Sequence, residues 1–198
     1  QLLPVQLQDL ELQYECLWGS VVDLSQLTRL QRLTFRCNGE GCRLSGLPLH
    51  LQELNIRMYR LSMCSPSINI TTATHLHRLC VSDSQETAQD LLVLCTLPAL
   101  QHLELAYVGW DRAAAAAEAW PHLQMLRNIR LEAGEPFVSM HASALSNSLR
   151  GLLPHIAAVS GLTCLDLKCR MHSGIESVPI ELCEHIANLF ELRELFLH

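Results

Sequence analysis

Aromatic residues make up only 5% of the 198-residue chain and charged residues only 17%. Lysine is nearly absent, since 13 of the 14 basic residues are arginine. The formal net charge of −6 excludes a nucleic-acid-binding surface spread over the whole chain, although it leaves room for a local basic stripe. Because 49% of the residues are hydrophobic, compositional disorder is also excluded. We therefore expect a folded chain whose partners are proteins, with no nucleic acid among them.

Long apolar runs are missing as well. The longest, Leu91 to Leu100, is interrupted by Thr96 and Pro98 and falls short of the roughly 18 residues that a membrane span needs. Residues 1–9 lack both a basic start and a small-residue cleavage site, which argues against a secretory signal peptide. The sequence does not begin with Met, so targeting signals further upstream stay open. The sequence predicts no membrane span.

The cysteines do not form the even, compact framework of a small secreted domain. There are nine, an odd number, scattered along the chain. This pattern favours free thiols in a reducing compartment and predicts an intracellular, cytoplasmic protein. The sequon Asn69-Ile70-Thr71 is the one contrary signal, and it keeps extracellular recognition as an alternative.

What the sequence has in excess is leucine, 40 residues in all, and much of it recurs in the pattern Leu-x-x-Leu-x-Leu. Position 1 of this hexamer is leucine in all eight copies, position 4 is leucine except at Ile129, and position 6 is always apolar. Successive copies start 21 to 36 residues apart, at Leu7, Leu30, Leu51, Leu76, Leu100, Leu126, Leu162 and Leu192.

The pattern has a physical interpretation. Positions 4 and 6 share one face of a short strand, whereas positions 5 and 7 point the opposite way. One copy cannot bury its leucines alone, but stacked copies form a continuous leucine core beside a parallel sheet. We therefore predict an α/β fold, a curved solenoid of about eight repeats over residues 1–198. Its parallel β-sheet lies on the concave side, with helices or irregular segments on the convex side.

The chain resembles the leucine-rich-repeat family over essentially its whole length. Variable repeat lengths are similar to those of irregular intracellular members, such as F-box substrate receptors and ribonuclease-inhibitor-like proteins. Position 9, usually Asn or Cys in the family, fits only at Asn38. The resemblance implies non-catalytic protein recognition. Because no polar capping segment follows Leu197, we also expect the chain to belong to a longer solenoid or to have its ends covered by a neighbour.

The segments between the hexamers carry helix signals in the longer repeats. Capping residues, helical spacing and proline stops predict helices over 87–96, 113–120, within 143–161 and from 177 to about 190. The 21-residue repeat leaves little room for a helix, so residues 39–50 are predicted to be irregular or a single turn.

No constellation of residues predicts catalysis. Ser82 and Asp83 with His75 or His77 could be assembled into a hydrolase triad, but strand alternation separates their side chains. Cys164, Cys169 and His172 lack the spacing of a usual zinc site. We therefore predict no enzyme, no cofactor and no metal. An enzyme would need a separate catalytic domain outside these residues.

The candidate binding site is the outward side of the sheet, where positions 5, 7 and 8 are expected to form adjacent ribbons. Tyrosine and arginine are enriched at binding hot spots. The candidate protein-binding residues are Tyr14, Arg36, Arg57, Met58, Asp83, Glu104, Tyr107 and Arg130.

Two alternatives stay open. In the first, the concave face is only solvated, and binding uses the loops or the convex helices, with the long return Glu135 to Gly161 as a docking element. The second concerns the role itself. A scaffold or accessory subunit of a multi-subunit complex is favoured, and the substrate-recognition region of an F-box-type ubiquitin ligase receptor is the alternative. That alternative requires an F-box segment upstream, and none is visible before Leu7.

Overall fold

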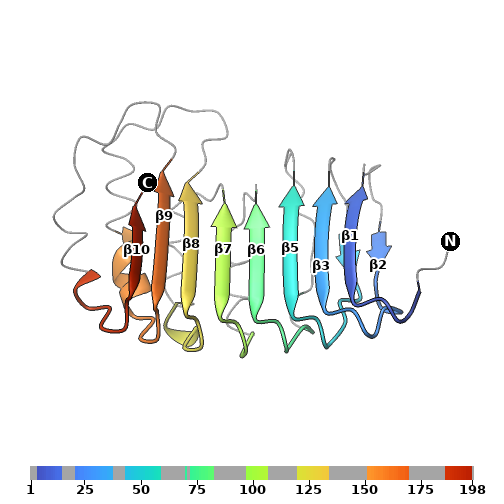
Figure 1. Cartoon of the computed structure of the whole chain (residues 1–198), viewed down its shortest axis with the longest axis horizontal. Helices are drawn as coiled ribbons and strands as arrows, with labels where there is room; N and C mark the ends of the chain where they lie inside the picture. The colour runs from blue at the N-terminus through green and yellow to red at the C-terminus, as the bar shows by residue number, and fades with distance from the viewer. Residues whose placement is uncertain are drawn as a thin grey trace.

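The computed structural model describes residues 4–14, 21–37, 43–58, 70, 72–82, 97–106, 120–133, 151–169 and 186–197. Most of these residues belong to one eight-stranded sheet and to the turns that lead into its strands (Figure 1). The strands of this sheet are β1 (Asp9–Tyr14), β3 (Arg32–Cys37), β5 (Glu53–Met58), β6 (Arg78–Ser82), β7 (His102–Ala106), β8 (Asn128–Ala133), β9 (Cys164–Cys169) and β10 (Glu194–Leu197).

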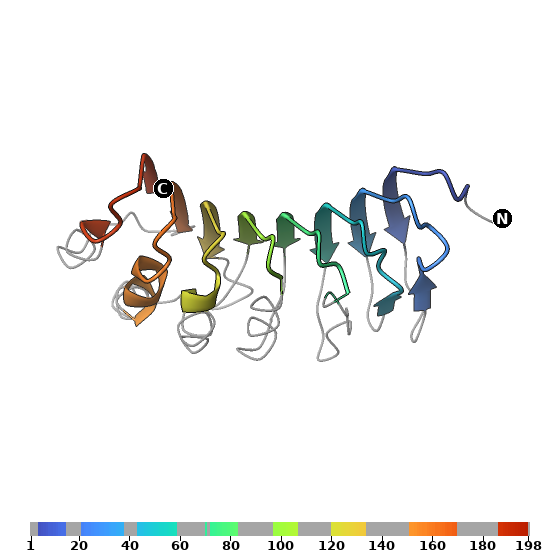
Figure 2. The same ribbon diagram turned by 90° about the horizontal axis from the view of Figure 1, so that it is seen from below.

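The strands lie in the order in which they occur in the sequence, and every neighbouring pair is parallel. Their register follows the hexamer. Leu10 lies opposite Leu33, Leu33 opposite Leu54, and each later position 4 opposite the next. Figure 2 shows the sheet bending gently, with the described parts of the returning segments on its convex side. The predicted curved leucine-rich-repeat solenoid is therefore confirmed.

Two repeated hydrogen-bond patterns lead into each strand. In all eight repeats the position 1 N–H donates to the carbonyl three residues earlier, at 3.0–3.3 Å. In all seven junctions the position 2 carbonyl accepts both the position 2 and position 3 N–H groups of the following repeat, at 2.8–3.1 Å. These bonds satisfy the backbone just before the strand and fix the register of successive repeats.

The core lies between the sheet and the returning segments. In the six inner repeats the side chains at positions 1, 4 and 6 are at most 6% exposed. A further buried column stands three residues before position 1, and sequence analysis did not identify it. Its buried apolar members are Leu27, Ala73, Leu97, Leu123, Val159 and Leu189. The carbonyls of this column accept the position 1 N–H groups, so the turn and the core share these residues.

The first returns contain a second, smaller sheet. β2 (Val21–Asp23) pairs in parallel with β4 (Arg43–Ser45), and Val22 lies opposite Leu44. The expectation that residues 39–50 are irregular or form one turn is therefore wrong over residues 43–45. The physical reason is that an extended return lets the two backbones pair while Leu44 packs into the core, where it is 1% exposed.

The predicted helices are only partly within the described residues. Residues 151–157 are helical and confirm that part of the helix expected within 143–161. Trp120 is buried and begins the 3-10 helix η1 (Trp120–His122), which contains Pro121. Residues 87–96, 113–119 and 177–185 lie outside the described ranges. Across the described residues, no helix is both long and apolar enough to cross a membrane.

Candidate protein-binding surface

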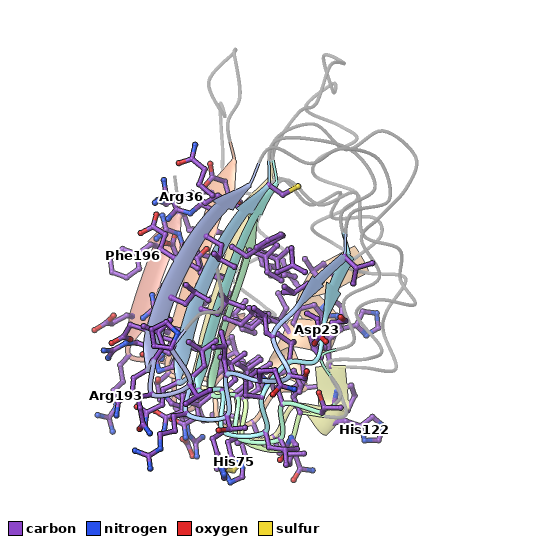
Figure 3. All side chains as sticks on the ribbon, turned by 90° about the vertical axis from the view of Figure 1, so that its right-hand side faces the viewer. Asp23, Arg36, His75, His122, Arg193 and Phe196 are labelled. Carbon is purple, nitrogen blue, oxygen red and sulfur yellow. The ribbon has the colours of Figure 1, made fainter. Side chains whose placement is uncertain are left out.

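The outward face of the eight-stranded sheet consists of the side chains at positions 3, 5 and 7. Position 5 runs from Glu11 through Asn55 and Glu104 to Phe196, and its members lie opposite one another in register. Figure 3 shows Arg36 and Phe196 on the outward side of the sheet, whereas Asp23 and His122 lie on the return side. Eight strands thus present one continuous surface away from the core.

The sequence prediction of the outward face did not include position 3. It has the same parity as positions 5 and 7, so strand alternation alone was enough to identify it. Its side chains follow one another across the sheet as Asp9, Arg32, Glu53, Arg78, His102, Asn128, Cys164 and Glu194.

Position 8 was predicted to form a third outward ribbon, and this prediction is wrong at Cys37, the one residue of that column whose side chain the structure describes. Cys37, at position 8 of β3, is 3% exposed and belongs to the hydrophobic core. The reason is that β3 continues through this residue, so alternation places position 8 on the same face as positions 4 and 6. Four candidates occupy position 8. For Tyr14 and Met58 the structure describes only the backbone, at the ends of β1 and β5, and Asp83 and Tyr107 lie outside the described residues.

The first two strands are joined by ion pairs across the outward face. Arg32 forms two contacts with the Asp9 carboxylate, one of them from Nη2 to Oδ2 at 2.8 Å. The hydrogen bond from Arg32 lowers the pKa of Asp9. Arg36 Nη2 lies 3.0 Å from Glu11 Oε1. Arg32 and Asp9 both occupy position 3, so their ion pair lies along one column. The other pair is diagonal, because Arg36 occupies position 7 and Glu11 occupies position 5.

A second group of contacts surrounds Arg130. Its Nε lies 3.6 Å from Glu104 Oε1 and 3.4 Å from Asp166 Oδ2, so one arginine stands between two carboxylates in register. Cys80 extends this column because its thiol donates to Glu104 Oε2 at 3.6 Å. The predicted residues Glu104 and Arg130 are thus brought together as a partly exposed ion pair, in which Arg130 Nε makes no hydrogen bond.

Arg57 has a different environment. Its side chain is exposed and lies opposite Arg36 on one side and Ser82 on the other. The Ser82 hydroxyl donates to the Ile56 carbonyl at 3.4 Å. Within the part of the chain that the structure describes, Arg57 has neither a hydrogen-bond partner nor an ion-pair partner. Of the predicted residues with described side chains, it is the arginine most available to another molecule.

The cysteines on the outward face are held in the thiol form. Burial raises the pKa of Cys80, and the nearby Glu104 carboxylate adds to this effect against the opposing hydrogen bond from Arg78. Burial likewise raises the pKa of Cys164, which also contacts Glu194. Because the thiolate is the nucleophile and the metal ligand, this environment disfavours both roles. Among the described residues, no group of three His, Cys, Asp or Glu side chains is placed to hold a metal ion.

His102 gives the outward face a pH dependence. Burial lowers its pKa, and the positive charges of Arg78 and His77 lower it further. Its Nδ1 lies 2.7 Å from Asn128 Nδ2, a contact that suits an unprotonated Nδ1 accepting from the amide. The folded protein therefore favours neutral His102 more than the unfolded chain does.

We expect the protein to lose stability as the pH falls from about 6.5 through the lower pKa of folded His102, because the unfolded chain then binds the extra proton. His102→Gln should reduce the difference in melting temperature between pH 7.5 and pH 5. A change of 1 kcal/mol in stability shifts the melting temperature of a domain of this size by roughly 2–4 °C. Because solvent screens the half-exposed His102, we expect the substitution to change the melting-temperature difference by less than this.

Differential scanning calorimetry of both proteins at the two pH values measures this effect. The other nine histidines are present in both, so the difference isolates His102. An equal loss of melting temperature on acidification in the two proteins would contradict the assignment.

The sequence matches no family model and no curated protein. Among solved structures, internalin C2 from Listeria monocytogenes is 15% identical, with a TM-score of 0.38, over 95% of this chain and 80% of that one. The functional domain of InlJ from Listeria monocytogenes is 16% identical, with a TM-score of 0.43, over 98% of this chain and 40% of that one. The chain's own repeat, register and buried leucine columns make it a leucine-rich-repeat solenoid.

Proposed function

We propose that this chain is a non-catalytic protein-binding module whose partner contacts the outward face of the eight-stranded sheet. The observation that carries the proposal is the continuity of this face. Side chains at positions 3, 5 and 7 follow one another in register over eight strands, and no return segment of the described residues interrupts them. A rigid sheet holds such side chains in place before binding, which reduces the entropy lost on association.

The dimensions of the outward face suit a folded partner. With strands about 4.8 Å apart, eight strands extend over about 34 Å, and six residues of strand extend over about 20 Å. The resulting area is about 700 Å², close to the roughly 800 Å² that each partner contributes to a standard interface. A single helix or an extended segment would cover only part of it.

We favour a scaffold or accessory subunit of a larger assembly as the role of this module. The support is that the described side chains offer recognition chemistry, with exposed charges and protonated thiols, rather than an activated nucleophile. The substrate-recognition region of an F-box-type ubiquitin ligase receptor is the second candidate, and it rests on the resemblance of the variable repeats to that class. The two roles share the same surface and differ in whether a ubiquitin ligase is recovered with the chain.

The test compares two bulky substitutions on opposite sides of the solenoid. Asn55→Trp places an indole on the outward face, on the third of the eight strands, without changing charge, and His122→Trp places one on the return side. Each variant and the wild type are used as bait in the source cells, followed by quantitative mass spectrometry. We expect Asn55→Trp to deplete the specific partners at least about tenfold and His122→Trp to retain them. The reverse outcome would place the interface on the convex side.

A further inference from the structure

We infer that the partner meets the outward face with an acidic segment, and that carboxylates of this segment bind Arg57 together with Arg36. This inference rests on the proposed function and names the chemistry of the partner. It starts from the distribution of charge over the outward face, which does not follow that of the whole chain.

Four arginines gather on three neighbouring strands. Arg32 and Arg36 lie on β3, Arg57 lies on β5, and Arg78 lies on β6, and we call these four residues the arginine strip. The only carboxylate at positions 3, 5 and 7 of the same strands is Glu53. These positions carry a surplus of three positive charges, which Asp9 and Glu11 on the adjacent β1 reduce to one, in a chain whose formal net charge is −6. Oppositely charged segments are attracted to such a patch and oriented by it.

The arginines of the strip are not equally neutralised. Asp9 pairs with Arg32, and Glu11 pairs with Arg36 through one nitrogen. Arg57 has no partner among the described residues. A guanidinium group has five donors arranged to bind carboxylates through two bonds, so the strip retains unused donors.

The register makes this arrangement unfavourable in the free protein. Arg36 and Arg57 lie directly opposite each other on adjacent parallel strands. Like charges in this position destabilise a sheet. Glu11 offsets the charge of Arg36 in part, whereas the position 5 neighbours Thr34 and Asn55 carry no charge that offsets Arg57. A carboxylate bound between the two guanidinium groups would remove the repulsion and satisfy their donors at the same time.

The strands that follow would repel the same segment. On β7 to β9, Arg130 is already placed between Glu104 and Asp166, and Glu132 lies opposite Lys168. At positions 3, 5 and 7 these strands carry three carboxylates, Glu104, Glu132 and Asp166, against two cations, Arg130 and Lys168, so their net charge is −1. The acidic part of the partner is thereby directed to β3, β5 and β6, and the remaining outward face is left for uncharged or basic contacts.

A nucleic acid fits the strip less well than an acidic protein segment. Single-stranded nucleic acid is usually held by aromatic side chains that stack on its bases. Positions 5 and 7 of these strands supply Thr34, Asn55, Cys80 and Ser82 beside the arginines, and none of them is aromatic. The strip therefore offers charge and hydrogen bonds, which suits carboxylates.

The experiment uses a fluorescein-labelled peptide of eight glutamates as the probe and a matched peptide of eight glutamines as its control. Fluorescence anisotropy measures the binding of each to the whole chain in about 50 mM salt. We expect saturable binding of the glutamate peptide only. Arg57→Gln should weaken it about tenfold, as expected for loss of a charged hydrogen-bond donor. Arg29→Gln, at an exposed arginine in the turn before β3, should weaken it less than twofold.

Three outcomes would overturn the inference. The first is that Arg57→Gln and Arg29→Gln lose the same amount of binding. The second is that the glutamate and glutamine peptides bind equally well. The third is that a labelled oligouridine binds more tightly than the glutamate peptide. Failure of the glutamate peptide to bind at about 1 mM would overturn it as well. The proposed function is tested separately, because Asn55→Trp changes no charge. Partner loss in Asn55→Trp without glutamate binding would leave the surface correct and the acidic chemistry wrong.

A stability measurement separates binding from folding. Removing one of two opposed like charges should leave the urea midpoint of Arg57→Gln unchanged or slightly raised. Weaker peptide binding together with an unchanged midpoint therefore assigns the loss to the outward face. A clearly lowered midpoint would show that Arg57 has a structural partner and would also overturn the inference.

Discussion

Replacing Leu103 with alanine is expected to lower the free energy of unfolding by about 2–5 kcal/mol. Leu103 occupies position 4 of β7, is 2% exposed, and lies between Leu79 and Ile129 of the neighbouring strands. Truncation removes apolar atoms from the core and leaves a cavity that two fixed strands cannot close. Because small domains are stable by only about 5–15 kcal/mol, the loss is a large share of the total.

The matched control is Leu195→Ala, which makes the same change at the same repeat position in β10. Leu195 is 40% exposed, so its truncation removes less buried surface, and we expect a loss below about 1 kcal/mol. Urea denaturation followed by circular dichroism measures both variants. Equal losses in the two would show that burial at position 4 does not depend on the neighbouring repeats, which contradicts the stacked core.

The eight-stranded sheet could be predicted because its signal is both periodic and repeated. A strand has a side-chain period of two, so apolar residues at positions 4 and 6 define its inner face. Eight aligned copies then define the register, since any slip would place a polar side chain in the core. The same reasoning extends to the buried column three residues before position 1. That column has a fixed offset from the hexamer, but Pro4 and Pro48 partly conceal its apolar character.

The return segments were harder to predict because their lengths differ. No fixed offset relates Val22 to Leu44, so the pairing of β2 with β4 has no repeated signature in the sequence. Two backbones pair there because the first returns are extended and lie side by side, which is a tertiary effect. The sequence pattern alone therefore indicates a loop where the structure has a short strand.

The candidate site shows the same division. Alternation and register place Arg36, Arg57, Glu104 and Arg130 on one face, as predicted. Which charges neutralise one another depends on side-chain conformation, since Arg36 reaches diagonally to Glu11 whereas Arg130 contacts both neighbours in its own column. The availability of Arg57 therefore comes from the structure, although its position comes from the sequence.

Gly46 provides the second large effect. It follows β4 with a φ of +65°. Residues other than glycine rarely adopt this left-handed backbone conformation. A Cβ at this position would meet the Asp23 carboxylate and would lie 2.7 Å from the Ser25 backbone nitrogen. The same carboxylate accepts a hydrogen bond from the Ser25 N–H at 2.9 Å. The added methyl group would therefore press on the turn that follows β2.

Gly46→Ala is expected to lower the free energy of unfolding by at least about 2 kcal/mol. The left-handed conformation costs about 1–2 kcal/mol for a residue with a Cβ, and overpacking adds about 1–3 kcal/mol. Urea denaturation measures the change. A backbone atom blocks the new methyl group, so the strain cannot be relieved by a side-chain rotation, and the two-stranded sheet must move as a unit.

Gly161→Ala is the control, because its Cβ would chiefly meet the end of the flexible Arg127 side chain and its φ is not in the left-handed region. Arg127 can move at the expense of its 2.7 Å hydrogen bond to the Gly161 carbonyl, a loss of about 1 kcal/mol. If Gly46→Ala proved no more harmful than Gly161→Ala, the turn after β4 would have to adopt another backbone conformation. The pairing of β2 with β4, which depends on that turn, would then also be in question.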